Sequence, residues 1–201
     1  MLSERELRRV LRRLPLITLE GPFHRFADFW FVHQRLVSGE APDLLRGLGA
    51  RMFGGRFTPP GKFETLYVAV TPETARIEAE SIFTGSGIVR SLDKPYVHFT
   101  INGLVEGILD LSDVAIQKSL GTTREELSSP WRTLQARGHE APTQMLGRIV
   151  HGIRRIQALL YQSSKNAPQG RCLAIFPERL VTSSWLQIID DSGRLANERL
   201  P

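Results

Sequence analysis

The sequence contains a single cysteine, Cys172, among its 201 residues. No intramolecular disulfide can form, and a zinc site built from several cysteines is excluded. No uncharged apolar run approaches the roughly 18–20 residues that a membrane-spanning helix needs. The segment 1–14 is rich in arginine, whereas a secretory signal peptide carries an apolar stretch there. We therefore expect a cytoplasmic protein that makes no contact with a membrane.

Several catalytic and cofactor motifs are also absent. The five histidines show no His-Glu-x-x-His or comparable metal-ligand spacing, so we expect no metal. The chain has no phosphate-binding loop ending in Gly-Lys-Ser/Thr and no Gly-x-Gly-x-x-Gly run after a strand, so nothing indicates a nucleotide kinase or a Rossmann dehydrogenase. No Gly-x-Ser-x-Gly elbow surrounds Ser163, which argues against a Ser/His/Asp hydrolase.

The composition is that of an ordinary globular protein, with 41% hydrophobic and 23% charged residues. No repeat or linker divides the chain, so we expect one domain over residues 1–201. Strand candidates lie at Phe23–Ala27, Leu66–Val70, Tyr96–Ile101, Leu104–Leu111, Cys172–Phe176 and Val181–Ile189. Helix candidates lie at 1–15, from Thr71 onward, at Ser112–Leu120, at Thr122–Leu127 and at Pro142–Arg155. Because strands and helices do not alternate strictly, an α+β fold is favoured.

The basic excess of 26 Lys+Arg over 21 Asp+Glu is concentrated partly in segment 1–15. Its apolar residues recur at helical spacing, so the segment is predicted to be an amphipathic helix whose five arginines face solvent. Direct nucleic-acid binding is disfavoured because the charge is modest and no aromatic residue is interleaved with it. An electrostatic surface for a partner remains an alternative.

Glu78 is the most informative position. In the helix predicted to begin after Thr71, the apolar stripe is formed by Ala75, Ala79, Ile82 and Phe83. Glu78 fills the remaining position of that stripe, so its carboxylate is aimed inward. An unpaired buried carboxylate is costly, and such a group should be paired, hydrogen-bonded or lining a cleft. Glu78 is therefore either a catalytic carboxylate or the buried partner of an arginine.

Two arginines are candidates for holding an anion. Arg25 lies in a strand-like segment, and Arg56 follows two glycines in the loop Gly54–Gly61, where the backbone can approach a ligand and a guanidinium can bind phosphate oxygens. Each is otherwise a surface or salt-bridge arginine. The ring of Tyr67, in a strand predicted to be buried, can wall a pocket or belong to the core. Ser163 is expected at the mouth of a loop as a hydrogen-bonding residue.

These residues, in this order, resemble the RES-domain family from about Gly21 to Phe176. The resemblance is carried by Arg25, Gly55-Arg56-Phe57, Leu66-Tyr67-Val68-Ala69, Thr74-Ala75-Arg76-Ile77-Glu78 and Tyr161-Gln162-Ser163, with Asp110-Leu111-Ser112-Asp113 and Trp131 between them. The chain departs from the family pattern at three positions. Phe57 and Thr58 stand where tryptophan and asparagine are usual, and Gln162 stands where proline is frequent.

The resemblance implies a fold similar to the ADP-ribosyltransferases, a mixed sheet with flanking helices that binds NAD⁺ in a cleft as substrate, without a separate cofactor. Family members break the nicotinamide–ribose bond and pass the ADP-ribosyl group to inorganic phosphate, water or protein, and the acceptor stays open here. The implied catalytic residues are Glu78, Arg56 and Ser163. The implied NAD⁺-binding residues are Arg25, Phe26, Phe57 and Tyr67.

Many members of the family are toxins of toxin–antitoxin pairs. The resemblance therefore implies a helix-turn-helix antitoxin of the Xre type as partner, and the sequence leaves open whether the chain forms a homo-oligomer. Two alternatives belong to other classes. One is a nucleic-acid-binding module built on the basic helix, and the other is a catalytically inactive interaction domain.

Overall fold

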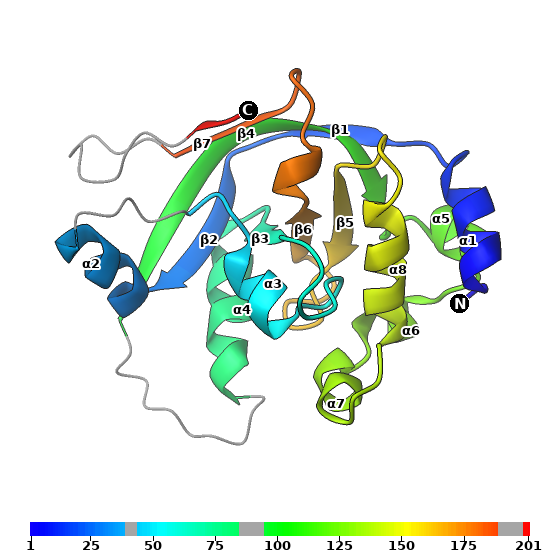
Figure 1. The fold of residues 1–201 in the computed structure, drawn as a ribbon, viewed down its shortest axis with the longest axis horizontal. Coiled ribbons are helices and arrows are strands. Elements are labelled where there is room, and N and C mark those ends of the chain that lie inside the picture. Colours follow the sequence, from blue (N-terminus) through cyan, green and yellow to red (C-terminus); the bar gives the residue numbers. More distant parts are fainter. Residues whose placement is uncertain (39–43, 85–94, 189–198) are drawn as a thin grey trace.

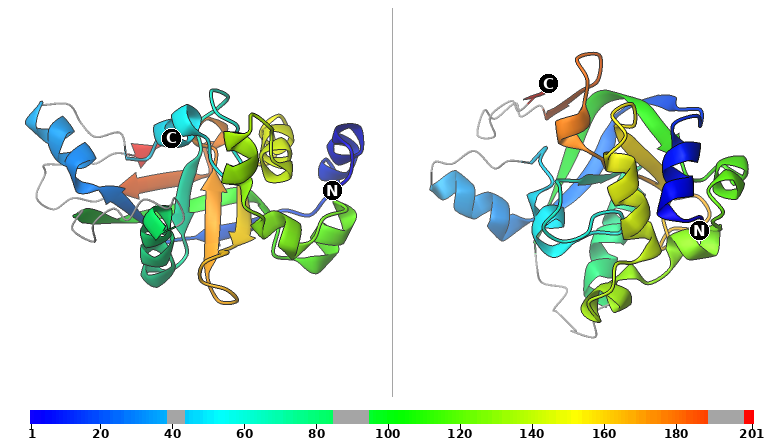
Figure 2. Two further views of the ribbon diagram at one scale, coloured as in Figure 1. Left: turned by 90° about the horizontal axis from the view of Figure 1, so that it is seen from below. Right: turned by 45° about the vertical axis from the view of Figure 1, so that its right-hand side comes forward.

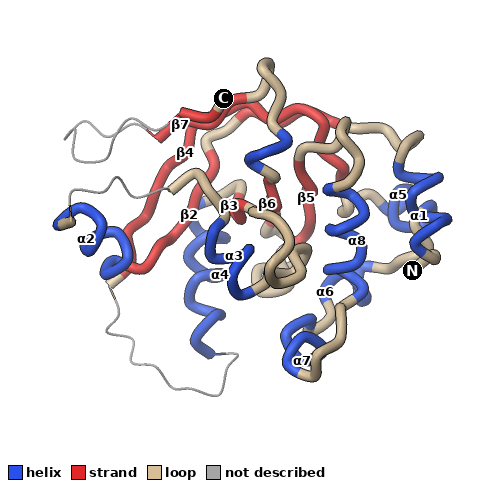
Figure 3. Tube along the Cα trace, viewed as in Figure 1, coloured by secondary structure: helices blue, strands red, loops and turns tan. Residues whose placement is uncertain are grey.

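The computed structural model describes residues 1–38, 44–84, 95–188 and 199–201 (Figures 1 and 3). Its helices are α1 (Glu4–Leu11), α2 (Phe29–Val37), α3 (Leu48–Phe53), α4 (Pro72–Thr84), α5 (Val114–Ser119), α6 (Arg124–Ser128), α7 (Trp131–Ala136) and α8 (Pro142–His151), with a 3-10 turn η1 (Pro177–Arg179). Its strands are β1 (Ile17–Glu20), β2 (Phe23–Asp28), β3 (Leu66–Ala69), β4 (Tyr96–Asp110), β5 (Ala158–Gln162), β6 (Arg171–Ile175), β7 (Trp185–Ile188) and β8 (Arg199–Leu200).

The strands form one mixed sheet, in which β2, β4, β5, β6 and β3 pair in a closed ring. β4 pairs antiparallel with β1 and β2, antiparallel with β7, and parallel with β5. From β5 the sheet continues through β6 to β3. β3 then meets β2 through one residue pair, His24 opposite Ala69. The predicted α+β class with a mixed sheet is confirmed. The weakly paired seam between β2 and β3 is where the cavity described below is found.

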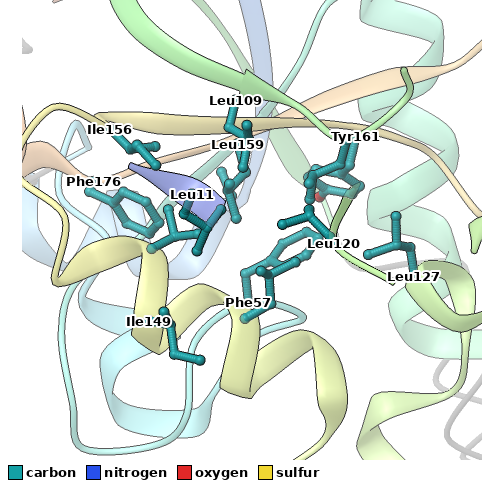
Figure 4. Close-up of a cluster of buried hydrophobic side chains, with 14 of the residues drawn as sticks. Leu11, Phe57, Leu109, Leu120, Leu127, Ile149, Ile156, Leu159, Tyr161 and Phe176 are labelled. Atoms are coloured by element: carbon teal, nitrogen blue, oxygen red, sulfur yellow. The ribbon is translucent and has the colours of Figure 1, made fainter. Parts of the chain in front are cut away.

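Helices cover this sheet from different sides (Figures 1 and 2). α4 packs against β2 and β3, while α1 packs against α8 at the end of the molecule opposite α2. One hydrophobic cluster lies between the sheet and α1, α5 and α8, and a second surrounds β2, β4 and β7. Figure 4 shows part of the first cluster, with Leu11 beside Leu159 and Phe57 below Tyr161. The helices thereby hold β5 and the loop before β3 in fixed positions.

The predicted basic helix is present as α1. Leu7 and Leu11 are fully buried, and Glu6 accepts a hydrogen bond of 3.0 Å from the backbone N–H of Ser3 at the start of the helix. Arg8 pairs with Glu4 across 2.8 Å on the outer face. The amphipathic interpretation is confirmed, although the helix ends at Leu11 rather than at residue 15. None of the helices in the described ranges is long and apolar enough to cross a membrane.

Three further predicted boundaries are wrong. The segments Tyr96–Ile101 and Leu104–Leu111 form one strand, β4, because Asn102 and Gly103 pair with β7 instead of making a turn. A side chain at Gly103 would place its Cβ 2.5 Å from the carbonyl oxygen of Trp185, so glycine allows the close approach of β7. The helix predicted over Pro142–Arg155 ends at His151. The final predicted strand shortens to Trp185–Ile188, and its last residue, 189, lies outside the described residues.

Candidate active site

A cavity of about 440 Å³ lies at the seam between β2 and β3, walled by α4, α7 and the loop that follows α3. This volume falls within the roughly 300–1,000 Å³ typical of small-molecule sites. Four cationic side chains and two carboxylates line it, namely Arg25, Arg56, Arg132 and Lys165 with Asp28 and Glu78. The surplus of positive charge suits an anionic ligand.

A tight turn over Gly55–Thr58 sends two neighbouring side chains in opposite directions. The N–H of Gly55 donates to the carbonyl of Thr58 at 2.8 Å, and the N–H of Thr58 donates back at 3.2 Å. Arg56 lines the cavity, whereas Phe57 is fully buried and packs edge-on against Tyr161, with ring centroids 5.0 Å apart (Figure 4). Phe57 therefore supports the cavity from the core and does not line it, which corrects the expectation that its ring contacts the substrate.

Arg56 is held in place by three protein acceptors. Its Nη1 donates to the carbonyls of Leu127 at 2.8 Å and Ser129 at 3.1 Å, and its Nη2 donates to Oγ of Ser164 at 3.2 Å. A guanidinium has five N–H groups. Two of those of Arg56 therefore stay available to a ligand in the cavity.

Tyr67 anchors the same turn and also lines the cavity. Its Oη accepts a hydrogen bond of 2.9 Å from the N–H of Phe57 and lies 3.0 Å from Oγ1 of Thr58. Burial raises the pKa of Tyr67 to about 12, so the hydroxyl is neutral. A Cβ at Gly55 would lie 2.5 Å from this hydroxyl, which explains the glycine. Thr58, in the family's asparagine position, additionally donates to Oγ1 of Thr65 at 2.7 Å.

A second clamp on this turn escaped the sequence analysis. Gln144 of α8 is buried, and its Nε2 donates to the carbonyl of Gly55 at 3.1 Å and to Oε1 of Gln135 at 2.7 Å. Its Oε1 accepts from the N–H of Ala141 at 3.1 Å. A glutamine in an amphipathic helix gives no sign of this role, because its partners come from distant segments of the chain.

Glu78 projects from α4 into the cavity, as its place in the helical stripe predicts. The neighbouring Ala75 and Ala79 line the cavity too, while the side chains at 82 and 83 lie outside the described part of the chain. Ser163 donates a hydrogen bond of 2.6 Å to Oε1 of Glu78. Ser163 is 1% exposed and does not itself line the cavity. It therefore positions the carboxylate from behind.

The loop that carries Ser163 is tied to α4 at a second point. The N–H groups of Lys165 and Asn166 donate to Oγ of Ser163 at 3.1 and 2.9 Å. The side-chain amide of Asn166 donates to Oγ1 of Thr74 at 2.9 Å, one turn before Glu78. Gln162, in the position where the family often has proline, donates to the carbonyl of Pro168 within this loop. These contacts fix the loop and the helix relative to each other.

Arg25 and Phe26 reach the cavity from β2. Arg25 is part-buried, and its Nη1 donates to the carbonyl of Leu44 at 2.6 Å. Phe26 stacks on His98, with ring centroids 4.8 Å apart, and His98 stacks on His24. Burial, followed by repulsion from His98, lowers the pKa of His24. The structure thus brings the predicted residues Arg25, Arg56, Phe26, Tyr67 and Glu78 to one cavity.

Arg132 of α7 is a further cavity residue that sequence reasoning missed. Its guanidinium carbon lies 4.5 Å from the ring centroid of Trp131, which is buried. Desolvation, and secondly the charge of Arg56, lower the pKa of Arg132, while the charge of Glu78 opposes that shift. Arg132, Arg56 and Glu78 therefore lie close enough to interact electrostatically.

The single cysteine lies beneath the cavity. Burial raises the pKa of the Cys172 thiol to about 12, and the nearby charge of Glu78 adds to this. A neutral thiol is a poor nucleophile, so Cys172 serves as a packing residue in this wall. Within the described ranges, no three His, Cys, Asp or Glu side chains form a group that could hold a metal ion.

The model of the RES domain family matches residues 28–191, which include Arg56, Tyr67, Glu78 and Ser163 and exclude Arg25 and Phe26. Curated relatives include the NAD(+) phosphorylase MbcT of Mycobacterium tuberculosis and that of Mycobacterium bovis. Each is 30% identical over 107 residues, or 52% of this chain. The chain spans 58% of the length of these relatives.

A solved structure resembles the whole fold. The crystal structure of the M. tuberculosis MbcT–MbcA toxin–antitoxin complex contains a chain that superposes with a TM-score of 0.66. The superposition covers 92% of this chain and 90% of that one, at 20% sequence identity. The two proteins therefore share a fold.

Proposed function

This chain belongs to the RES-domain family, and from that premise we propose that it cleaves the nicotinamide–ribose bond of NAD⁺. The observation that carries the proposal is the pair formed by Glu78 and Ser163, which holds a carboxylate at a cavity beside Arg56. The curated relatives named above as NAD(+) phosphorylases also support it. We also propose that residues 1–201 form a single domain.

The chemistry requires little from the protein beyond electrostatics and positioning. When the bond between C1′ of the ribose and the pyridinium nitrogen breaks, the electron pair leaves with nicotinamide. Nicotinamide departs as a neutral molecule, so no general acid is needed. Positive charge develops on the ribose, and the carboxylate of Glu78 stabilises it directly or through the ribose hydroxyls. Ser163 holds that carboxylate in the required orientation.

The other cavity residues are assigned to binding. Arg25 and Arg56 carry the charge that a diphosphate needs, and Arg56 has two N–H groups left for it. The rings of Phe26 and Tyr67 are suited to packing against nicotinamide or ribose. Phe57 acts only through the core. NAD⁺ enters as a substrate, and no resident cofactor or metal takes part.

Inorganic phosphate is the acceptor that we favour, because the relatives are named phosphorylases. One phosphate oxygen forms the new bond to C1′, the proton of monohydrogen phosphate stays on the phosphoryl group, and ADP-ribose 1″-phosphate is released with nicotinamide. The enzyme is then a glycosyltransferase that transfers ADP-ribosyl groups. Transfer to water, which yields ADP-ribose, and transfer to a protein are the alternative outcomes of the same bond cleavage.

We further propose that the protein is the cytoplasmic toxin of a toxin–antitoxin pair, with a helix-turn-helix antitoxin as partner. The support is the family and the shared fold with the MbcT chain of the toxin–antitoxin complex. Toxicity on expression, relieved by Glu78→Ala, is expected. Toxicity that persists in this variant would indicate a binding activity instead, such as nucleic-acid binding by α1.

The direct test is to incubate purified protein with NAD⁺, with and without phosphate, and to identify the products by mass spectrometry. We expect one nicotinamide to be released for each NAD⁺ consumed. When phosphate is present, the other product should be ADP-ribose 1″-phosphate. Glu78→Gln should lower kcat by about 10²–10³-fold, as expected for loss of one transition-state contact. Glu80→Gln is the matched control, since Glu80 is exposed on the same helix and pairs with Arg76. Equal turnover of Glu78→Gln and wild type contradicts the assignment.

A further inference from the structure

Arg132 is a cationic cavity residue that forms no salt bridge in the described part of the chain. Its guanidinium stacks on Trp131 and makes no hydrogen bond or salt bridge to a described residue. The other arginines of this wall are occupied differently, because Arg56 donates to two carbonyls and a serine, and Arg25 to the carbonyl of Leu44. Arg132 is thus the guanidinium at this cavity with all five N–H groups available.

The surroundings make this arrangement costly without an anion. Arg56 lies near enough for its charge to lower the pKa of Arg132. Arg56 is half-buried, whereas Arg132 stays exposed to solvent while lining the same cavity. Lys165 adds a third positive charge to the same lining. Glu78 offsets part of this charge, but its Oε1 is engaged by Ser163. Like charges that converge on a partly desolvated cavity are stabilised by an anion bound between them.

The shape of the donors selects the kind of anion. A guanidinium is a planar fork that binds two phosphate oxygens at once, and two such forks can surround one phosphoryl group. The ring of Trp131 lies against the guanidinium of Arg132 and restricts its orientation. The hydrogen bonds from Arg56 to the carbonyls of Leu127 and Ser129 likewise restrict the orientation of the Arg56 guanidinium.

We propose that Arg132 and Arg56 together bind a phosphoryl oxyanion in this cavity. The inference rests on the proposed function and extends it with a residue that neither the family resemblance nor the sequence analysis assigned. Two molecules in that reaction carry such an oxyanion. They are inorganic phosphate, the acceptor, and NAD⁺ itself through its diphosphate. Both present the same chemistry to the two guanidinium groups.

Anion binding is measured first, because it does not depend on turnover. Isothermal titration calorimetry with inorganic phosphate and with pyrophosphate is carried out on the wild-type protein, Arg132→Gln and Arg137→Gln. Arg137 is exposed at the end of α7, so its substitution removes the same charge from the same helix outside the cavity. We expect Arg132→Gln to weaken binding of at least one anion about tenfold or more, and Arg137→Gln to leave it within twofold. Equal affinities in all three proteins, or no binding by the wild type, overturn the proposal.

Steady-state kinetics then identifies the source of the oxyanion. A rise in KM for phosphate with little change in KM for NAD⁺ assigns Arg132 to the acceptor, and the reverse pattern assigns it to the diphosphate. Unchanged values of both constants in Arg132→Gln overturn the inference while the NAD⁺-cleaving function stands. Loss of anion binding in Arg132→Gln, with no NAD⁺ consumed even by wild type, supports the anion site and overturns the proposed function.

Discussion

The hydroxyl of Ser163 donates its one hydrogen to Oε1 of Glu78, 2.6 Å away. A serine hydroxyl has two further sites, both acceptors. The N–H groups of Lys165 and Asn166 occupy them at 3.1 and 2.9 Å. The direction of the hydrogen bond to Glu78 is therefore fixed by the loop, and so is the orientation of the carboxylate at the cavity.

Replacing Ser163 tests this relationship. Ser163→Ala removes the hydrogen bond to Glu78, and we expect kcat for NAD⁺ cleavage to fall about ten- to a hundredfold, the range for a lost hydrogen bond to a charged group. KM for NAD⁺ should change by less than about threefold, since Ser163 does not line the cavity. Ser183→Ala, at an exposed serine that binds Glu106, is the control. A loss confined to thermal stability, with kcat intact, would show that Ser163 serves only the fold.

The glycine that faces Tyr67 gives a prediction about the turn. In Gly55→Ala the new Cβ would meet the Tyr67 hydroxyl at 2.5 Å, so the turn must shift and carry Arg56 with it. We expect a loss of about 1–3 kcal/mol in the free energy of unfolding, measured in urea, and a higher KM for NAD⁺. The same substitution at Gly49, which has no atom within 4 Å of the new Cβ and lies in α3, should stabilise the protein slightly. Equal stability of the two variants would contradict the packing argument.

The hydroxyl of Tyr67 provides a third test. Tyr67→Phe leaves the N–H of Phe57 without its acceptor, which should cost about 1–3 kcal/mol in the free energy of unfolding. Because burial raises the pKa of Tyr67 to about 12, wild-type activity should show no alkaline limb from this residue below about pH 10. A kinetic pKa between 8 and 10 that disappears in Tyr67→Phe would give this hydroxyl a catalytic ionisation instead.

Stability should also depend on pH through His151. Its ring stacks on Phe63, with centroids 4.0 Å apart, and burial lowers its pKa below the ordinary value of 6.5, although Glu178 opposes the shift. The unfolded chain therefore binds a proton that the folded protein does not. The free energy of unfolding keeps this contribution above pH 6.5 and loses it as the pH falls toward the folded pKa.

Urea unfolding at pH 7.5 and pH 5 measures this effect. His151→Phe keeps the aromatic stack and removes the titrating group, so its loss of stability between the two pH values should be smaller than that of the wild type. His139→Phe, at an exposed position, is the control and should behave like the wild type. An equal loss in His151→Phe and wild type would exclude His151 as a source of the pH dependence.

Local patterns in the sequence predicted the residues whose roles are encoded locally. The apolar stripe of one helix predicts that the carboxylate of Glu78 faces inward. The two glycines before Arg56 predict a loop in which its guanidinium can bind an anion. Helical periodicity alone predicts this orientation of Glu78, because Ala75 and Ala79 lie on the same helix face and also line the cavity.

Residues that act through tertiary contacts were not predictable in this way. Gln144 and Arg132 reach the site from α8 and α7, and neither stands in a pattern that differs from an ordinary helical surface. The family resemblance places Phe57 against the substrate, but consecutive residues of a tight turn diverge, and Phe57 is fully buried. The backbone conformation of the turn decides whether Arg56 or Phe57 faces the core, and the sequence does not give that conformation.

The turn over Gly55–Thr58 serves both ligand binding, through Arg56, and core packing, through Phe57. The side chain that reaches the ligand cavity and the one that fills the hydrophobic interior are chain neighbours, so a mutation that moves the backbone of this turn displaces both. Variants selected for another substrate through a shift of this turn are then expected to lose folded protein along with activity. Altered selectivity is better sought in α7, where Arg132 can be changed without disturbing the interior.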